Sequence, residues 1–276
     1  MAKTNGLNVR LYVEGYDLSG DANALSGMGY NNELLDVTTL DVSAKKRIIG
    51  IVDGEISVDA FFDNASAKQH AVWTSNSGKL PTADQEVLVP MGSAVGDPSV
   101  SLVSKEGTYS VTRSPGSAIA ATATFTANGS GPEFGIMLTS HTDSITASTS
   151  GSSVDNSASS SSGGSWIYQV TALSAVGGNA RWHLNVQHSS DNSTWTDASS
   201  ATVTASDGIG AARATFTGTL NRYVRQRVVL DASSGSITVP PLAPITSAPS
   251  GSLISKSIVV VGKAGKLLLT SKGIIA

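Results

Sequence analysis

A strict alternation of hydrophobic and polar residues runs through much of the chain and predicts β-strands. In residues 7–14, LNVRLYVE, every second side chain is Leu or Val, as a strand with one buried face requires. The segment 55–63, EISVDAFFD, alternates in the same way. Its hydrophobic row consists of Ile56, Val58, Ala60 and Phe62. We expect these side chains to lie in a core beneath a sheet.

A row of acids occupies the opposite face of that second strand. Its members are Glu55, Asp59 and Asp63. Another Ile/Val-rich run, Arg47–Val52, precedes the strand, and an Asp-Gly pair separates the two runs. Because Asp-Gly tolerates the positive φ of a two-residue type I′ turn, the sequence predicts a β-hairpin over 47–63.

Other segments predict more strands and one helix. The further alternating runs in the first half are 86–91, 100–105, 108–112 and 118–127. A helix is predicted over ASAKQHAVW, residues 65–73, because Asp63 or Asn64 can cap its start. Its apolar residues, Ala67, Ala71 and Val72, can then lie against a sheet. This order favours a β-sandwich or barrel with one flanking α-helix.

The second half begins with a segment of very different composition. Residues 148–165 contain 10 Ser and 3 Gly, and such a stretch buries too little apolar surface to offset the entropy of ordering. We therefore expect a linker there. Alternation resumes in four runs, at 166–172, 181–188, 211–217 and 223–230. A turn is expected at 191–193, Asp-Asn-Ser.

These patterns divide the chain into consecutive parts. Residues 1–147 are expected to form a β domain, 148–165 a linker and 166–240 a small β-sandwich module. Residues 241–276 begin with a proline-rich connector and end in two short apolar runs. Such short runs cannot fold alone, so they must pack on this subunit or on a neighbour.

Composition narrows the classes of function. Charged residues make up 14% of the chain, the net charge is −3, and there is no cysteine. Disulfides and thiolate chemistry are therefore excluded, and attraction of the whole chain to nucleic acid is disfavoured. The charge is uneven, since residues 1–147 carry 9 Lys/Arg against 16 Asp/Glu and residues 148–276 carry 9 against 5. The two halves could attract each other between subunits.

Candidate chemistry is sparse. His183 and His188 have an odd spacing, which places them on opposite faces of a strand and disfavours a shared metal. The acid row could supply paired carboxylates, but alternate residues on a strand stand roughly 7 Å apart, and a solvated face is favoured. The densest basic stretch, 222–227, could contact phosphate or pair within the protein. We expect no enzymatic activity and no cofactor.

The order of several short segments is more informative than any motif. A strand with VEGYDLSG is followed by LDVTTLDVSAKKRIIGIVDGEISVDAFFD, a helix and LPTADQEVLV. Over about residues 7–145 this order resembles the tail tube (major tail) proteins of long-tailed, siphovirus-type bacteriophages. The module at 166–240, with HSSDNSTWTD, resembles the immunoglobulin-like or jelly-roll additions that phage structural proteins carry on their outer surface.

The resemblance implies a structural virion protein. Homohexameric rings would stack into a tail tube, with a tape measure protein and tail terminator or distal tail proteins as further partners. DNA would pass through the lumen without specific binding. A lumen lined by Glu55, Asp59 and Asp63 would repel its phosphates. The protein would be made in the host cytoplasm without membrane insertion, since no apolar run approaches the roughly 18 residues of a membrane span.

Two segments are expected to act between subunits. The stretch 23–46 is long and weakly patterned, and the C-terminal runs carry four lysines, so neither buries itself convincingly in its own subunit. The candidate inter-subunit residues are Asn31, Glu33, Lys45, Lys46, Arg47, Ile258, Val260, Leu267 and Leu269. The alternative functions are a capsid decoration or head-fibre protein, or a carbohydrate-binding module built on Trp166, Trp182 and Trp195.

Overall fold

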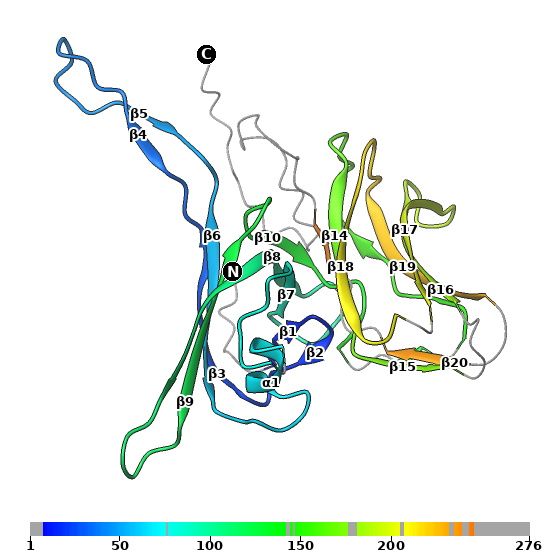
Figure 1. Ribbon diagram of the computed structural model, residues 1–276. Coiled ribbons are helices and arrows are strands. Elements are labelled where there is room, and N and C mark those ends of the chain that lie inside the picture. The colour runs from blue at the N-terminus through cyan, green and yellow to red at the C-terminus, as the bar shows by residue number, and fades with distance from the viewer. Residues whose placement is uncertain are drawn as a thin grey trace. The chain divides into compact units, whose positions relative to one another are not determined.

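A computed structural model describes residues 8–75, 77–141, 144–145, 147–175, 181–204, 207–231, 235–238 and 243–245 (Figure 1). The protein is mainly β, as the alternation predicts. It divides into two compact units that are interleaved in the sequence. The β6 unit, named after strand β6 (Gly54–Phe61), comprises residues 20–87 and 102–132. The β16 unit, named after strand β16 (Arg181–Ser189), comprises residues 1–19, 88–101 and 133–276. The expected boundaries at 147, 165 and 240 do not coincide with these units.

The β6 unit is an antiparallel sheet with a short helix. Its elements are β3 (Ala22–Tyr30), β4 (Leu34–Asp36), β5 (Arg47–Ile49), β6 (Gly54–Phe61), α1 (Gln69–Trp73) and β9 (Ala120–Ala127). Strands β7 (Gln85–Pro90) and β8 (Pro98–Thr112) contribute residues to both units. Strand β6 pairs with β3 on one side and with β9 on the other, and β9 pairs with β8.

One face of this sheet forms the core of the β6 unit. Ile56, Val58 and Ala60 are buried as predicted, and Phe62 is half-buried. The Trp73 ring of α1 meets the Phe125 ring of β9 edge-on, with centroids 6.2 Å apart. The helix therefore lies against the predicted hydrophobic row.

The helix itself is shorter than predicted. It begins at Gln69 rather than at 65, and Lys68 precedes it without a side-chain cap. Asp63 instead accepts a hydrogen bond from the Ala65 N–H at 2.9 Å, which organises the turn before the helix. Ala67 has a φ of 62°, which is incompatible with an α-helix, so the first part of the segment cannot join α1.

The predicted hairpin at 47–63 is wrong. Strand β5 pairs with β4 and β6 pairs with β3, so both runs pair with the segment upstream of them, which the sequence presented as a loop. Gly54 is buried at the start of β6, where a Cβ atom would lie 2.5 Å from the Gly29 carbonyl oxygen and would clash with the Pro132 ring. The glycine allows this close approach and does not form a turn.

The β16 unit contains two main layers of strands and a small third sheet. Its strands are β1 (Tyr12–Val13), β2 (Tyr16–Asp17), β10 (Glu133–Ile136), β11 (Ser144–Ile145), β12 (Thr149–Ser150), β13 (Val154–Asp155), β14 (Gly164–Val170), β15 (Ala172–Ala175), β16 (Arg181–Ser189), β17 (Thr196–Thr204), β18 (Gly210–Phe216), β19 (Tyr223–Asp231), β20 (Gly235–Thr238) and β21 (Ala243–Ile245). One layer contains four strands in the order β18-β14-β21-β10. The other layer contains four strands in the order β12-β19-β16-β17. Trp166 of β14 and Trp182 of β16 belong to one buried cluster.

A buried ion pair ties strands of this unit together. Arg213 of β18 donates from Nε and Nη2 to the two carboxylate oxygens of Glu133 on β10, at 2.8 and 2.6 Å. The Ser165 hydroxyl of β14 donates to the same carboxylate at 3.0 Å. Glu133 is only 4% exposed, so its charge depends on these partners.

The Ser/Gly-rich segment differs from the expected linker. Strands β12 and β13 lie within it, and both pair with β19. Val154 is buried, and the Asp155 carboxylate receives two hydrogen bonds from Arg222, at 2.6 and 2.7 Å. One apolar side chain, one ion pair and a neighbouring sheet edge are enough to order a segment whose composition alone indicates a coil.

Candidate functional site

The polar face of the β6 unit sheet carries two of the three predicted acids. Glu55 and Asp59 are exposed on β6, opposite the buried row. Their direct neighbours on β9 are Thr126 and Thr122. The Thr122 hydroxyl donates to Asp59 Oδ1 at 3.0 Å. The face is thus a surface of carboxylates and hydroxyl groups held on a rigid sheet.

The third predicted acid does not share this position. Asp63 lies beyond the end of β6, is half-buried, and has the turn role described above. The structure therefore brings Glu55 and Asp59 together on one strand and places Asp63 in the turn that follows the strand.

Lys105 of β8 adds a positive charge to this face. It pairs in register with Thr126, which in turn pairs with Glu55. Its Nζ lies 2.7 Å from Asp84 Oδ1 and 2.6 Å from the Thr82 carbonyl oxygen. Hydrogen bonds from Lys105 and Asn128 lower the pKa of Asp84. The lysine is therefore neutralised locally, and the two β6 acids keep the face acidic.

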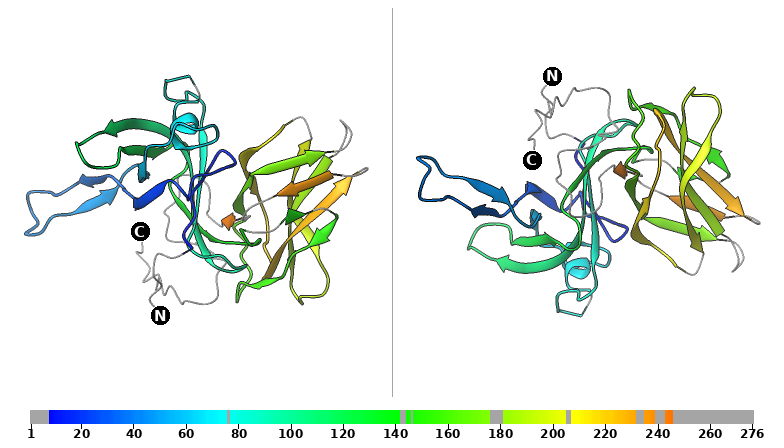
Figure 2. Two further views of the ribbon diagram at one scale, coloured as in Figure 1. Left: turned by 90° about the horizontal axis from the view of Figure 1, so that it is seen from below. Right: turned by 90° about the horizontal axis from the view of Figure 1, so that it is seen from above.

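A second candidate surface is the hairpin that extends β3 and β6, here called the arm, residues 31–53. Figures 1 and 2 show it running clear of the other strands of its unit. Its backbone ladder includes β4 with β5 and the bonds Asn31 N–H to Asp53 O and Val37 N–H to Lys46 O, at 2.7 and 2.9 Å. All five inter-subunit candidates of the first half lie on it: Asn31, Glu33, Lys45, Lys46 and Arg47.

The arm exposes hydrophobic side chains along its length. Leu34 pairs with Ile49, and these side chains are 60% and 55% exposed. Leu35 pairs with Ile48, and these are 41% and 52% exposed. The sequence indicated the polar candidates here but not the exposed pairs, because Leu34 and Leu35 lie in a stretch predicted as a weakly patterned loop and Ile48 and Ile49 lie in a predicted hairpin strand. The C-terminal candidates, Ile258, Val260, Leu267 and Leu269, lie outside the described residues.

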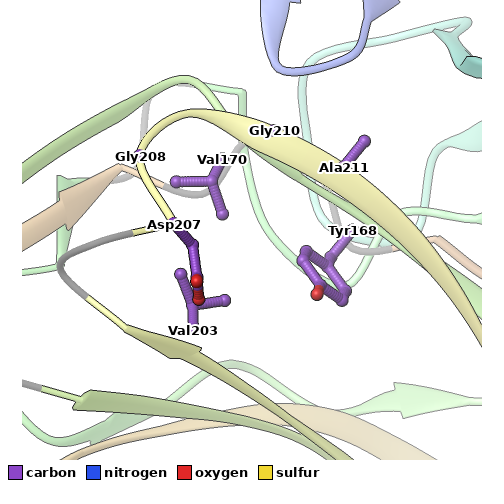
Figure 3. A pocket seen from close by; sticks show the side chains of 7 residues that line it. All are labelled: Tyr168, Val170, Val203, Asp207, Gly208, Gly210 and Ala211. Atoms are coloured by element: carbon purple, nitrogen blue, oxygen red, sulfur yellow. The ribbon is translucent and has the colours of Figure 1, made fainter.

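The β16 unit offers a shallow pocket (Figure 3). Its volume is about 190 Å³, and its lining consists of Tyr168, Val170, Val203, Asp207, Gly208, Gly210 and Ala211. The ionisable side chains of this lining are the Asp207 carboxylate and the Tyr168 phenol. Within the described residues, no group of three or more His, Asp or Glu side chains is placed to hold a metal.

The histidines and the basic stretch of this unit have local partners. His183 Nδ1 lies 3.0 Å from the Thr202 hydroxyl, whereas His188 Nδ1 accepts from the Asn221 N–H at 2.9 Å. Arg222 pairs with Asp155, and this pairing helps to lower the Asp155 pKa to about 2. The Arg225 guanidinium lies 4.1 Å from the centroid of the Trp195 ring, which it covers. Arg222 and Arg225 are therefore held by partners within the β16 unit.

One buried acid of the β6 unit is not among the candidates predicted from the sequence. Glu106 of β8 is 5% exposed and pairs in register with Phe125. Within the described part of the chain neither of its carboxylate oxygens has a hydrogen-bond partner, and burial raises its pKa to about 8. Glu106 is in phase with the buried Leu102 and Ser104, so the alternation of β8 itself turns its side chain inward.

Among the described residues no helix is long and apolar enough to cross a membrane. No family model matches the chain, and no curated protein matches it.

Several solved structures are similar. The tail of an empty gene transfer agent particle with C6 symmetry shares 17% identity and covers 46% of this chain and 96% of its own, with a TM-score of 0.35. A sheath/tube terminator of an extracellular contractile injection system shares 8% identity and covers 49% and 97%, with a TM-score of 0.39. The SPP1 Dit protein, from the hub adsorption apparatus of Gram-positive-infecting phages, shares 12% identity and covers 86% and 98%, with a TM-score of 0.34. The identities and TM-scores are too low for these similarities to assign a function. A functional proposal therefore has to be argued from the surfaces of this chain.

Proposed function

We propose that the protein is a structural component of a bacteriophage tail tube. Copies of the chain form hexameric rings, the rings stack, and the sheet of the β6 unit lines a lumen through which DNA passes. The observation that carries the proposal is the two-sided character of this sheet. One face is a sealed core, and the other presents Glu55, Asp59 and a row of hydroxyl groups.

The acidic face suits a conduit for DNA. A surface that binds phosphates through Lys or Arg releases counterions and holds the DNA, whereas carboxylates at the wall repel it. Asp84 neutralises Lys105, so this lysine offers little charge to a passing phosphate. The DNA is therefore transported without being held.

The edges of the sheet favour assembly. Of the described strands, β3 pairs with β6 alone, so its outer edge is available to a strand of another copy. The arm extends from the same pair of strands and carries exposed hydrophobic residues that a lone subunit would leave in water. Both features support self-association. The tape measure and terminator proteins are expected partners of such a tube.

Electron microscopy of the purified protein and of virions tests the proposal. We expect stacked rings with six subunits in purified material and labelling of the tail in virions. Rings of another symmetry would reject the hexamer, and labelling of the capsid surface would support a decoration protein instead.

A charge reversal tests the lumen assignment. Virions carrying Glu55→Lys and Asp59→Lys together should eject DNA more slowly, because two lysines per subunit would attract phosphates. The fold should persist, since exposed charges contribute only about 0–1 kcal/mol each. The matched control is the neutral pair Glu55→Gln and Asp59→Asn, expected to lie between wild type and reversal. Adding Asp63→Lys also removes a turn contact, so it is tested separately. Wild-type ejection rates in the reversed variant would reject the lumen assignment.

A further inference from the structure

The arm has an unusual distribution of hydrophobic side chains. Side chains that are directly opposite on paired strands share a face, and neighbours along a strand lie on opposite faces. The Leu34–Ile49 pair therefore lies on one face of the ribbon, and the Leu35–Ile48 pair lies on the other. Between 41% and 60% of each of these four side chains is exposed. Neither face of the arm is a polar face.

A two-stranded ribbon of this kind needs cover on both sides. An isolated hairpin is marginally stable at best in water, and strands with one buried face show polar residues on the other. Docking on one flat surface would bury only one of the two hydrophobic pairs. The other pair would remain in water, at a cost of about 25 cal/mol for each Å² of apolar surface. The sequence of the arm is therefore suited to a position between two surfaces.

The rest of the chain offers a complementary surface. Thirteen large hydrophobic side chains are exposed among the described residues, and seven of them lie in the arm. Three others, Phe61, Val111 and Ile119, lie at the opposite end of β6. Val111 is on the core face of the sheet with Ala60 and Ala121, whereas Phe61 is on the opposite face with Glu55 and Asp59. Phe61 pairs with Ala120, Val111 pairs with Ala121, and the Phe62 N–H donates to the Ile119 carbonyl oxygen at 2.9 Å. An arm and a hydrophobic end on the same sheet can join copies head to tail.

We propose that each arm inserts between two further copies of this chain. One copy covers Leu34 and Ile49, the other covers Leu35 and Ile48, and the exposed Val111 and Ile119 at the far end of the sheet form part of one covering surface. Each arm is then a junction of three subunits. The contact is heterologous, because the arm and its receptor are different surfaces, and such contacts close into rings or continue as filaments. This inference rests on the proposed self-assembly and specifies its geometry.

Site-specific photocrosslinking tests the two-sided contact. The chain has no cysteine, so Ile49→Cys and Ile48→Cys each introduce a single labelling site, one on each face. Each variant is labelled with benzophenone maleimide, mixed with isotope-labelled wild type, assembled and irradiated. We expect intermolecular crosslinks from both positions, to different peptides. Crosslinks from only one face, or from both faces to the same peptide, would overturn the inference.

Paired substitutions provide a functional readout. Leu34→Thr with Ile49→Thr removes one hydrophobic pair, and Leu35→Thr with Ile48→Thr removes the other, while threonine keeps a high β-propensity. The matched control is Leu80→Thr with Ile209→Thr, two exposed residues outside the arm. We expect each arm double variant to raise the critical concentration for assembly at least 10-fold and the control to leave it unchanged.

The outcomes separate this inference from the proposed function. The unfolding temperature of the unassembled variants should match that of wild type, which excludes a folding defect. If one arm variant assembles as wild type does, the arm is covered on one face only and the tube proposal stands. If wild type forms no assembly, the proposed function itself fails.

Discussion

Strand β6 and the arm are consecutive in the chain and use similar side chains in opposite ways. Ile56 and Val58 on β6 are fully buried beneath α1, whereas Ile48 and Ile49 on the arm are about half exposed. Both segments carry aliphatic side chains, and both are paired strands. The difference shows that hydrophobic residues indicate burial without indicating which molecule provides it. On β6 the cover is the subunit itself, and on the arm it is expected to come from neighbours.

The largest expected effect on stability comes from removing one partner of a buried ion pair, and the same change in an exposed ion pair of the arm provides the comparison. Arg213→Met removes the partner of Glu133, which is buried in the β16 unit, and should cost about 3–5 kcal/mol of unfolding free energy. Lys45→Met removes a pair of the arm in which both side chains are exposed, and should cost about 0–1 kcal/mol. Urea denaturation of unassembled protein measures both. Equal losses of unfolding free energy in the two variants would contradict the contrast between the buried ion pair of the β16 unit and the exposed ion pair of the arm.

Hydrophobic truncation tests the same contrast directly. Ile56→Ala leaves a cavity beneath α1 and should cost about 2–5 kcal/mol. Ile49→Ala removes a side chain that is 55% exposed and should change the stability of the unassembled chain by no more than about 0.5 kcal/mol. The arm variant should instead weaken assembly, which sedimentation can follow. A large loss of subunit stability from Ile49→Ala would show that the arm is covered within its own subunit.

The pH dependence of stability is a more gradual effect, spread over several pH units. The Glu106 pKa is raised from 4.5 to about 8 in the folded state, so the folded protein binds a proton that the unfolded chain releases between these values. Stability should therefore fall as the pH rises through this window, by at most about 1.4 kcal/mol per pH unit, and level off above it. Glu106→Gln should remove this slope. An unchanged slope in the variant would assign it to other groups.

The sequence predicts the fold where its pattern has one physical explanation. Strict alternation placed Ile56, Val58 and Ala60 in the core, and Ala71 and Val72 of the helix are buried as expected. Prediction from the sequence failed where a residue type is compatible with two different local structures. Gly54 indicated a turn but allows a close contact with Pro132, and the serines of 148–165 indicated a coil although β19 provides an edge for pairing. Partners distant in sequence decided both cases.

The candidate site was predictable to a similar extent. Glu55 and Asp59 are exposed as predicted because alternation fixes the face of a strand. Asp63 left the row because the strand ends at Phe61, and sequence patterns are least reliable at the ends of elements. The exposed pairs of the arm could not be found from the sequence. A hydrophobic residue at an interface and one in a core follow the same pattern.

The two hydrophobic faces of the arm also have a kinetic consequence. If two neighbours must cover one arm, the first subunit to bind buries one face and leaves the other in water, so a dimer gains only part of the binding free energy. The third subunit completes the contact, and later additions proceed on a formed template. Such a system has a lag phase that seeds abolish and a free pool that persists below a threshold concentration. The protein could then accumulate as unpolymerised subunits until an initiating complex offers the first pair of covering surfaces.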